Sequence, residues 1–287
     1  MCPAHTTLPR VKFDRLWLGT ALGLALLVSS CRPRRGAHAP GAGAPDVKAV
    51  CSSGATLEQR PYKYENNQWG SGKEHGHYEQ CLLERTVAGR RELGWSWTWP
   101  GQDSSVFAYP EIIFGWKPWT GGRSSDHRFP LKLSEMQHLA IQYEVETNAT
   151  GSYNLAPEVW LISGRSGANT PNPALITAEV MFWMEASGVA RPAGVVVDQP
   201  VVAGVRYELW QLDHAGDNGA GGWRLLSFKA PSVERAGILP VDELLRYLVQ
   251  KGLVGAEQYV ASVEFGNEIS GGTGTTWVKK FAVDVTP

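Results

Sequence analysis

The stretch of sequence that decides the fold is Thr177-Ala178-Glu179-Val180-Met181-Phe182-Trp183-Met184-Glu185. β-Branched and aromatic residues dominate it and neither Gly nor Pro interrupts it, which predicts a β-strand. Alternate side chains of a strand point to opposite faces, so Val180, Phe182 and Met184 share an apolar face that we expect to meet the core. The other face carries Glu179, Met181, Trp183 and Glu185. A carboxylate beside a thioether and an indole suits a sugar-binding cleft, and an edge strand with one solvated face fits the pattern as well.

Short strand-like segments separated by turn-forming residues recur on both sides of this stretch. Their spacing predicts an all-β fold, a two-sheet antiparallel β-sandwich. Only the segment from Val241 to Gly252 has a helical pattern, with an apolar stripe of leucines, and we expect this helix to pack on the outside of a sheet. The strand segments are 60–65, 76–86, 93–99, 108–114, 139–147, 158–163, 178–185, 205–212, 223–230, 259–265 and 276–285.

The chain opens with a pattern typical of an export signal. Basic residues precede an apolar run from Leu16 to Val28, which is too short to span a bilayer and has the length of a signal-peptide core. The next residues, Ser29-Ser30-Cys31, complete a stretch similar to a bacterial lipobox, in which cleavage leaves the Cys as the lipidated N-terminus. Cleavage after Ala39 is the second-ranked alternative.

Three regions follow from this reading. We expect residues 1–31 to be a signal peptide with a lipidation site at Cys31, residues 32–48 to be a flexible linker rich in Gly, Ala and Pro, and residues 49–287 to form the folded domain. The last region, of about 240 residues, fits one large all-β domain better than two small ones.

Composition narrows the classes of partner. A net charge of -1 with 19% charged residues leaves no basic footprint, which argues against nucleic acid as a partner. The chain has 12 Trp, of which only Trp17 lies in the leader. The others must be buried or used in binding, and aromatic rings are the platforms on which the apolar faces of sugars stack.

Two of the four cysteines, Cys51 and Cys81, lie beyond the leader. In an oxidising compartment a disulfide between them is expected, closing a loop of about 30 residues and worth about 3 kcal/mol. Two free buried cysteines are the alternative.

A second carboxylate candidate stands near the C-terminus, in Val263-Glu264-Phe265-Gly266-Asn267-Glu268. Glu264 and Glu268 share a face if the strand stays regular, and Gly266 leaves room for a bulge that re-aims the later one. The segment from Ser270 to Gly274 reads as a glycine-rich loop. Glycoside hydrolysis requires one carboxylate that attacks the anomeric carbon and a second, protonated one that protonates the leaving oxygen.

Together with further aromatic motifs, these residues resemble glycoside hydrolase family 12. The resemblance runs from about Cys51 to Val285 and implies a concanavalin-like jelly roll with an open cleft on its concave face, and a retaining endo-β-1,4-glucanase that needs no metal or organic cofactor. The motifs, in the order found in the family, are Asn67-x-Trp69-Gly70, Trp95-x-Trp97, Tyr109-Pro110-Glu111-Ile112, Glu179-Val180-Met181-x-Trp183, Pro192-x-Gly194 and Gly266-x-Glu268.

The resemblance also implies residue roles. Glu179 would be the nucleophile and Glu268 the general acid/base, while Asn67 and Trp69 would bind sugar on the glycone side. The remaining implied binding residues are Met181 and Trp183 on the cleft floor, Trp97, and Pro192 in a loop across the cleft.

The sequence departs from the family pattern in two places. The family has an acidic residue beside the nucleophile, and here alignment gives either Glu158 or Asn154, of which we prefer Glu158. Family members often have Pro after the acid/base, where this chain has Ile269, so Glu264 remains an alternative acid.

We therefore expect an exported, extracellular or cell-envelope enzyme that cleaves β-1,4-glucosidic bonds of cellulose-type glucans, acts as a monomer, and is held at the membrane if Cys31 carries lipid. Xyloglucan and mixed-linkage β-glucan are alternative substrates. A non-catalytic carbohydrate-binding jelly roll is the alternative of a different class, although it would not need carboxylates at both Glu179 and Glu268.

Overall fold

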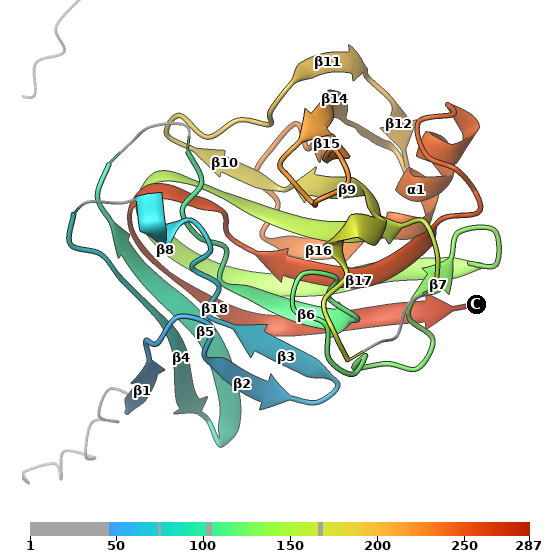
Figure 1. Ribbon diagram of the computed structural model, residues 1–287. Coiled ribbons are helices and arrows are strands. Elements are labelled where there is room, and N and C mark those ends of the chain that lie inside the picture. Colours follow the sequence, from blue (N-terminus) through green and yellow to red (C-terminus); the bar gives the residue numbers. More distant parts are fainter. Residues whose placement is uncertain (1–45, 74–75, 102–104, 166–168) are drawn as a thin grey trace, which may run out of the picture. The chain divides into compact units, whose positions relative to one another are not determined.

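The computed structural model describes residues 46–73, 76–101, 105–165 and 169–287 (Figure 1). The expected signal peptide, the Cys31 lipidation site and nearly all of the expected linker lie outside these residues. The first described strand, β1 (Val47–Val50), begins two residues before the expected start of the domain at residue 49. Residues 47 and 48 are therefore part of the folded domain because they pair with a neighbouring strand.

The strands form two sheets that share the long strand β8 (His138–Ile162). Sheet A runs in the order β1, β4 (Glu79–Val87), β5 (Arg90–Trp99), β18 (Ile269–Thr286), the first part of β8 and β16 (Ala236–Leu239), with β10 (Glu185–Ser187) also on β8. Sheet B runs in the order β2 (Thr56–Gln59), β3 (Tyr62–Glu65), β6 (Glu111–Gly115), β17 (Tyr259–Gly266), the second part of β8, β9 (Ile176–Trp183), β15 (Trp223–Lys229), β14 (Glu208–Ala215) and β11 (Val195–Asp198).

Smaller elements complete the chain. β7 (Leu131–Lys132) pairs with the start of β17, while β12 (Val201–Val202) and β13 (Val205–Arg206) form a separate pair. Single 3-10 turns lie at Ser71–Lys73 and Pro173–Leu175. The expected all-β sandwich is confirmed, and its described strands include one parallel pair, β9 with β15, because the chain makes a long excursion through β10 to β14 between them.

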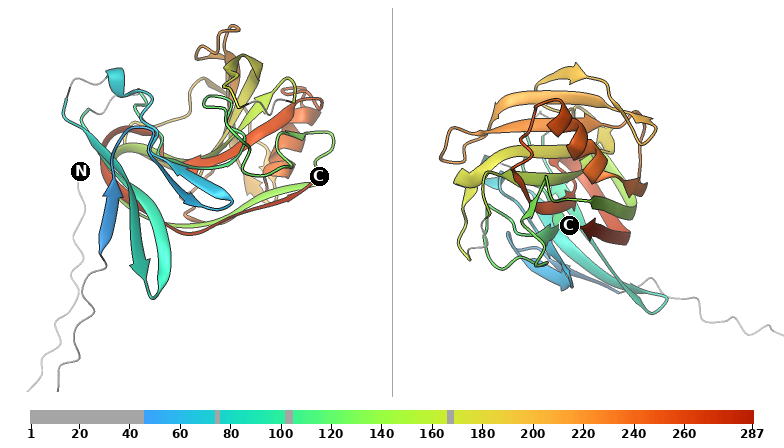
Figure 2. Two further views of the ribbon diagram at one scale, coloured as in Figure 1. Left: turned by 60° about the horizontal axis from the view of Figure 1, so that its bottom comes forward. Right: turned by 90° about the vertical axis from the view of Figure 1, so that its right-hand side faces the viewer.

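β8 and β18 run side by side as long curved strands (Figures 1 and 2). The sequence predicted two strands, 139–147 and 158–163, where β8 is continuous, because the polar residues between them still pair with β18 and β10. The segment Ser270–Gly274, expected to be a loop, is also paired strand. Its glycines permit close contact, since a Cβ on Gly272 would lie 2.1 Å from the Thr150 carbonyl oxygen.

The core lies between the two sheets and contains three tryptophans of β5, Trp95, Trp97 and Trp99, each at most 2% exposed. The expectation that Trp97 binds substrate is wrong. Its ring packs against Tyr153 with ring centroids 5.6 Å apart, and a Cβ on Gly274 would lie 2.3 Å from it. All three indoles share one face of β5, and that face meets the core.

The helix α1 (Val241–Gln250) is confirmed and is the one α-helix of the described residues. Its leucines Leu244, Leu245 and Leu248 belong to the main core cluster, and Tyr247 meets Phe228 of β15 edge-on. Phe228 stacks on Phe182, which points away from the cleft-facing side of β9, so the helix covers the opposite face of sheet B. Within the described ranges, no helix is long and apolar enough to cross a membrane.

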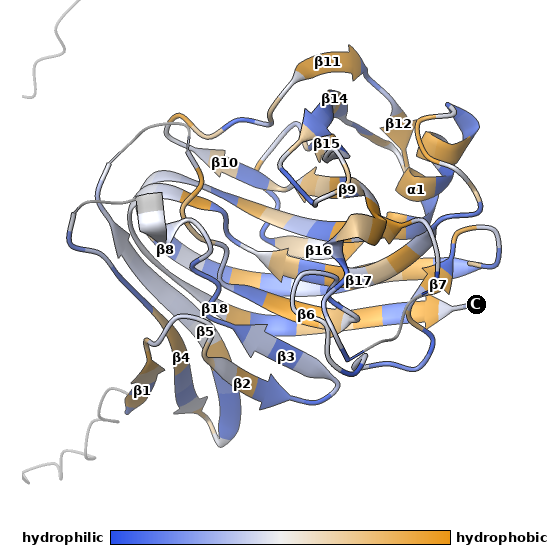
Figure 3. Ribbon diagram, in the orientation of Figure 1, coloured by the Kyte–Doolittle hydropathy of each residue, from blue (hydrophilic) through white to orange (hydrophobic). Residues whose placement is uncertain are grey.

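The edge of sheet B is apolar where β11 ends the sheet (Figure 3). Val195, Val196 and Val197 are 65%, 44% and 47% exposed. This apolar edge was not predicted from the sequence, because the pattern of these valines also fits a buried strand.

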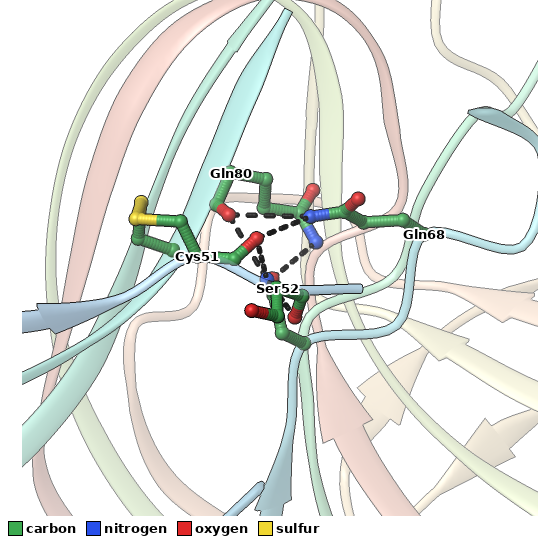
Figure 4. The surroundings of a disulfide bond; sticks show 6 residues. Cys51, Ser52, Gln68 and Gln80 are labelled. Carbon is green, nitrogen blue, oxygen red and sulfur yellow. Dashed lines mark hydrogen bonds between the residues drawn. A yellow bond between two sulfur atoms is a disulfide. The ribbon is translucent and has the colours of Figure 1, made fainter. Parts of the chain in front are cut away.

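A disulfide joins Cys51 to Cys81, as expected, and connects the end of β1 to β4 (Figure 4). Buried amide side chains surround it. Asn66 Nδ2 donates to the carbonyl oxygens of Cys51 and Gln80 at 3.1 and 2.9 Å, and Gln68 Nε2 donates to the Gln80 carbonyl oxygen at 3.2 Å. The bridge therefore anchors the first strand and the turn that leads to Asn67 and Trp69.

We predict that replacing both Cys51 and Cys81 by Ser lowers the free energy of unfolding by about 3 kcal/mol, because the unfolded chain gains the freedom of an open loop. For a domain of this size the melting temperature should fall by about 10 °C. Thermal unfolding of the variant and of wild type, each with and without reductant, measures this. A variant that melts at the wild-type temperature would show that the amide network alone holds β1.

Candidate active site

A cleft with a volume of about 780 Å³ opens on the face of sheet B that points away from the core. We call this cavity the cleft. Both carboxylates and aromatic rings line it, a combination that suits a sugar polymer. The carboxylates are Glu65, Glu158, Glu179, Asp217, Glu264 and Glu268, and the aromatic side chains are Trp69, Tyr109, Trp119, Trp160, Trp183 and Trp223.

Strand β9 divides its side chains between the cleft and the core as its alternation predicts. Glu179, Met181 and Trp183 line the cleft, while Val180 and Phe182 are fully buried in the main core cluster. Glu185 does not continue the cleft face, contrary to expectation. The chain bends at Met184 and pairs again in β10, where Glu185 accepts hydrogen bonds from Tyr153 and Arg235 at 2.9 and 2.7 Å.

The register of β8 places its own acidic residue in the same row. Glu158 lies opposite Met181 of β9 on one side and opposite Glu264 of β17 on the other, while Trp160 lies opposite Glu179. Glu158 is thus buried in the cleft floor between β9 and β17.

Glu268 lies where the chain passes from β17 to β18, and Asn154 of β8 holds it there. Asn154 Nδ2 donates to Glu268 Oε2 at 2.5 Å, and the Glu268 N–H donates to Asn154 Oδ1 at 2.8 Å. The Asn154 N–H in turn donates to the Glu268 carbonyl oxygen at 3.0 Å. Glu158 and Asn154, which alignment offered for one position, therefore occupy two different positions, and Asn154 contacts the acid/base candidate.

Asn267, the neighbour of Glu268, is buried and carries its own set of hydrogen bonds. Its Nδ2 donates to the Asn154 carbonyl oxygen at 2.6 Å, and its Oδ1 accepts from Trp95 Nε1 at 2.8 Å and Thr276 Oγ1 at 2.9 Å. These contacts fix the backbone on both sides of Glu268. Sequence reasoning missed Asn267 because its hydrogen-bond partners lie on three different strands, β8, β5 and β18.

Glu179 is buried and accepts a hydrogen bond from Trp223 Nε1 at 2.8 Å. Trp223 begins β15, which runs parallel to β9 with Leu225 opposite Glu179. The sequence identified Trp223 only as the start of a strand. No spacing signal could have found this contact, because it depends on the parallel pairing.

Burial raises the pKa of both candidate catalytic carboxyls. The pKa of Glu179 rises to about 8 through burial and then through the charge of Glu268, against the hydrogen bond from Trp223. Burial raises the pKa of Glu268 to about 7, although the hydrogen bond from Asn154 lowers it. Burial and then the charge of Glu179 raise the pKa of Glu158 well above its usual range. Protons are therefore held in the cleft at neutral pH.

Glu264 has a different environment. Lys117 Nζ lies 3.5 Å from Glu264 Oε2, 2.5 Å from Glu111 Oε1 and 3.9 Å from Glu65 Oε1, and all four side chains are buried. Burial acts to raise the pKa of Glu264, but the Lys117 charge and hydrogen bonds from Glu111 and Ser262 outweigh it and hold the pKa below its usual range. An ionised, paired Glu264 is unsuited to act as a general acid, which favours Glu268 over this alternative.

The other expected binding residues are distributed as follows. Asn67 and Trp69 line the cleft; Trp69 is 57% exposed and the Asn67 amide donates to Glu111 Oε1 at 2.8 Å. Pro192 is buried and does not line the cleft, whereas its neighbours Arg191 and Ala193 do. In the part of the chain that the structure describes, no three His, Cys, Asp or Glu side chains are grouped so as to hold a metal ion.

We predict that Glu179→Gln raises the melting temperature by several degrees at pH 8 and by much less at pH 5. Folding raises the Glu179 pKa from its ordinary 4.5 to about 8, so in that window the folded protein binds a proton that the unfolded chain has lost. Stability therefore falls as pH rises from about 5 to 8, and a neutral Gln removes this fall.

Calorimetric melting temperatures at pH 5, 6, 7 and 8 measure this effect. The exposed Glu135→Gln is the matched control, since it removes a carboxyl that folding does not bury. Equal pH dependence in Glu179→Gln and wild type would contradict the raised pKa.

Comparison with known proteins identifies the family. The model of glycosyl hydrolase family 12 matches residues 60–286. Endoglucanase S of Pectobacterium parmentieri is 31% identical over 221 residues, which cover 77% of this chain and 80% of that protein. A family 12 xyloglucanase from Bacillus licheniformis has a similar structure, with a TM-score of 0.74, 28% identity and coverage of 83% of this chain and 100% of the other. The chain belongs to glycosyl hydrolase family 12.

Proposed function

We propose that the chain is a retaining endo-β-1,4-glucanase in which Glu179 is the nucleophile and Glu268 the general acid/base. The observation that carries this proposal is the pair of buried carboxyls with raised pKa values, Glu179 and Glu268, in one open cleft lined by indoles. Membership of the family and the likeness to a protein named endoglucanase support it.

The proposed reaction is a double displacement. Ionised Glu179 attacks the anomeric carbon while protonated Glu268 gives its proton to the departing glycosidic oxygen, which leaves a covalent glycosyl-enzyme. Glu268, now ionised, takes a proton from a water molecule that attacks the same carbon, and Glu179 is released. Two displacements at one carbon retain its configuration.

The two carboxyls are electrostatically coupled, and the reaction starts from the form of the pair in which Glu268 carries the proton and Glu179 is ionised. The negative charge of Glu268 is the second cause of the raised pKa of Glu179, so the two carboxyls favour a state with one proton between them. When Glu179 forms the ester, its charge disappears and Glu268 gives up its proton more easily. Glu268 can therefore serve first as acid and then as base.

The supporting residues have distinct proposed roles. Glu158, which burial keeps protonated, shields the charge of Glu179 within the cleft floor. Met181 and Trp183 form the floor under the sugar, and Asn67 and Trp69 bind on the glycone side. Pro192 shapes the loop whose residues Arg191 and Ala193 line the cleft.

Xyloglucan is the second candidate substrate, and mixed-linkage β-glucan the third. The structural likeness to a Bacillus xyloglucanase favours xyloglucan, as do the xyloglucan-specific endo-β-1,4-glucanases of Aspergillus, which are 23% identical over 76% to 82% of this chain. A non-catalytic binding module is disfavoured because stacking on sugar needs no pair of buried, proton-holding carboxyls.

We also propose that the protein is exported and acts as a monomer, with a lipid tether if Cys31 is acylated. The apolar run before Cys31 supports export. The mass of the mature N-terminal peptide distinguishes a diacylglyceryl-modified Cys31 from a chain cut after Ala39.

We predict that wild type rapidly lowers the viscosity of carboxymethyl cellulose, xyloglucan or barley β-glucan while it releases few reducing ends, because an endo-acting enzyme cuts inside the chain. Glu179→Gln should lose at least about 1,000-fold in kcat because it removes the nucleophile. Glu135→Gln should match wild type. If wild type binds these polymers without cutting them, the binding-module alternative replaces this proposal.

We predict that Asn154→Ala lowers kcat about 10- to 100-fold and moves the alkaline limb of the kcat/KM profile to higher pH. The amide donates to Glu268 and lowers its pKa. Without it, the Glu268 side chain loses the contact that positions it, and its pKa rises. Asn148→Ala, at an exposed position of the same strand, is the control. An unchanged alkaline limb, with the variant still folded by its melting curve, would show that Asn154 does not act on Glu268.

A further inference from the structure

Trp223 is a residue of the cleft that the family resemblance did not lead us to expect. Its indole N–H donates to Glu179 Oε2 at 2.8 Å, and its ring lies half-buried at the cleft wall. A neutral donor to a carboxylate favours the ionised form, and this bond lowers the pKa of Glu179 against the effect of burial.

The indole is held on two sides by aromatic rings. Its centroid lies 5.3 Å from that of Trp119 and 5.6 Å from that of Trp160, both edge-on, and Trp119 and Trp160 are 5.5 Å apart. The three rings form a closed triangle, which we call the indole triangle. Trp160 also lies opposite Glu179 in the β8–β9 register, so the pairing of these two strands positions both the triangle and the carboxylate.

The loop before Trp223 closes on the indole from a third side. A Cβ on Gly216 would lie 2.0 Å from the six-membered part of the ring, so only glycine allows this approach. Asn218 anchors the loop: its Nδ2 donates to the Ile176 carbonyl oxygen at the start of β9, and its Oδ1 accepts from the N–H groups of Ala220 and Gly222 at 2.9 and 3.0 Å. The loop that positions Trp223 is thus tied to the strand that carries Glu179.

We propose that Trp223 is a positioning residue that binds the non-attacking oxygen of the nucleophile, Glu179 Oε2, through both steps of the reaction. The inference rests on the proposed function. Because the indole occupies Oε2, the geometry points to Oε1 as the attacking oxygen.

The electron count follows this assignment. In the first step a lone pair of Oε1 forms the bond to the anomeric carbon, and the bond to the leaving oxygen breaks with its electron pair as Glu268 supplies the proton. Oε2 then becomes the carbonyl oxygen of the ester and continues to accept the indole N–H. In the second step water adds to the carbon, its proton passes to Glu268, and the C–Oε1 electron pair returns to Glu179. The indole stabilises the departing carboxylate in this step.

Trp223→Phe tests the proposal, because it keeps an aromatic ring in the triangle and removes the N–H. We expect kcat to fall about 10- to 100-fold, as for loss of one hydrogen bond to a charged group, while KM changes little. The acid limb of kcat/KM should move to higher pH, since Glu179 loses a donor that favours its ionised form. With 2,4-dinitrophenyl β-cellobioside, the variant should show a larger burst of dinitrophenol than wild type, because release of the carboxylate slows more than its attack.

Trp119→Phe is the matched control. It replaces the indole of Trp119, another cleft-lining member of the indole triangle, by a smaller ring. The hydrogen bond from Trp223 to Glu179 is left in place. Its KM can change, whereas its acid limb should stay at the wild-type pH. If both Phe variants shift the limb alike, or neither does while both remain folded, Trp223 acts only by packing and the proposal is overturned.

A measurement that does not depend on activity separates this inference from the proposed function. The indole N–H resonance missing from the NMR spectrum of Trp223→Phe is that of Trp223. In wild type its shift should follow the titration of Glu179, and Glu179→Gln should remove this response. If the resonance titrates but wild type has no glucanase activity, the proposed function is wrong and the hydrogen bond from Trp223 to Glu179 is still supported. If wild type is active but the resonance does not titrate, the hydrogen bond is not made and this inference is overturned.

Discussion

The candidate active site depends on one crossing point. There the chain leaves sheet B after Gly266 and enters sheet A at Ile269, while β8 passes between the same sheets at Asn154. Strand pairing cannot satisfy the backbone there, so amide side chains take its place. Asn267 makes three buried hydrogen bonds and Asn154 contacts Glu268 through both its side chain and its backbone. A Cβ on Gly266 would lie 2.3 Å from the Pro110 carbonyl oxygen, so the crossing also requires glycine. Glu268 is held as firmly as a strand residue although it lies between two strands.

A second constraint is the number of carboxylates that sheet B buries on one face. Burying ionised carboxylates without partners would cost several kcal/mol each. Lys117 offsets the charge of the group around Glu264, whereas burial leaves protons on Glu158 and on the Glu179–Glu268 pair. The group next to Lys117 is thereby fixed in its ionisation, and the group next to Trp223 remains able to exchange a proton. One cleft therefore holds two kinds of carboxylate: Glu264, whose charge is paired with Lys117, and the Glu179–Glu268 pair, which shares a proton.

Alternation in β9 was sufficient to predict the core face, the cleft face and the place of Glu179. It failed at Glu185, because a period of two cannot reveal that the chain bends at Met184 into another sheet. The pattern of β5 was ambiguous, because three indoles on one face suit either a cleft or a core. Their burial in the main core cluster shows that this face meets the core, and Gly274 of β18 leaves room for Trp97 there. The roles of Trp223 and Asn267, and the contact of Asn154 with Glu268, could not be predicted from the sequence for a different reason. Each acts across strands whose neighbours depend on the topology, above all on the parallel pairing of β9 with β15.

The continuity of β8 and β18 determines how the protein unfolds. Both sheets share β8, and β18 follows it for most of its length, so neither sheet can detach while the other keeps its pairing. Amide hydrogens along these two strands should exchange with solvent only through global opening. Proteases cleave locally opened segments, and a sandwich joined through its longest described strand offers them few such segments in its centre.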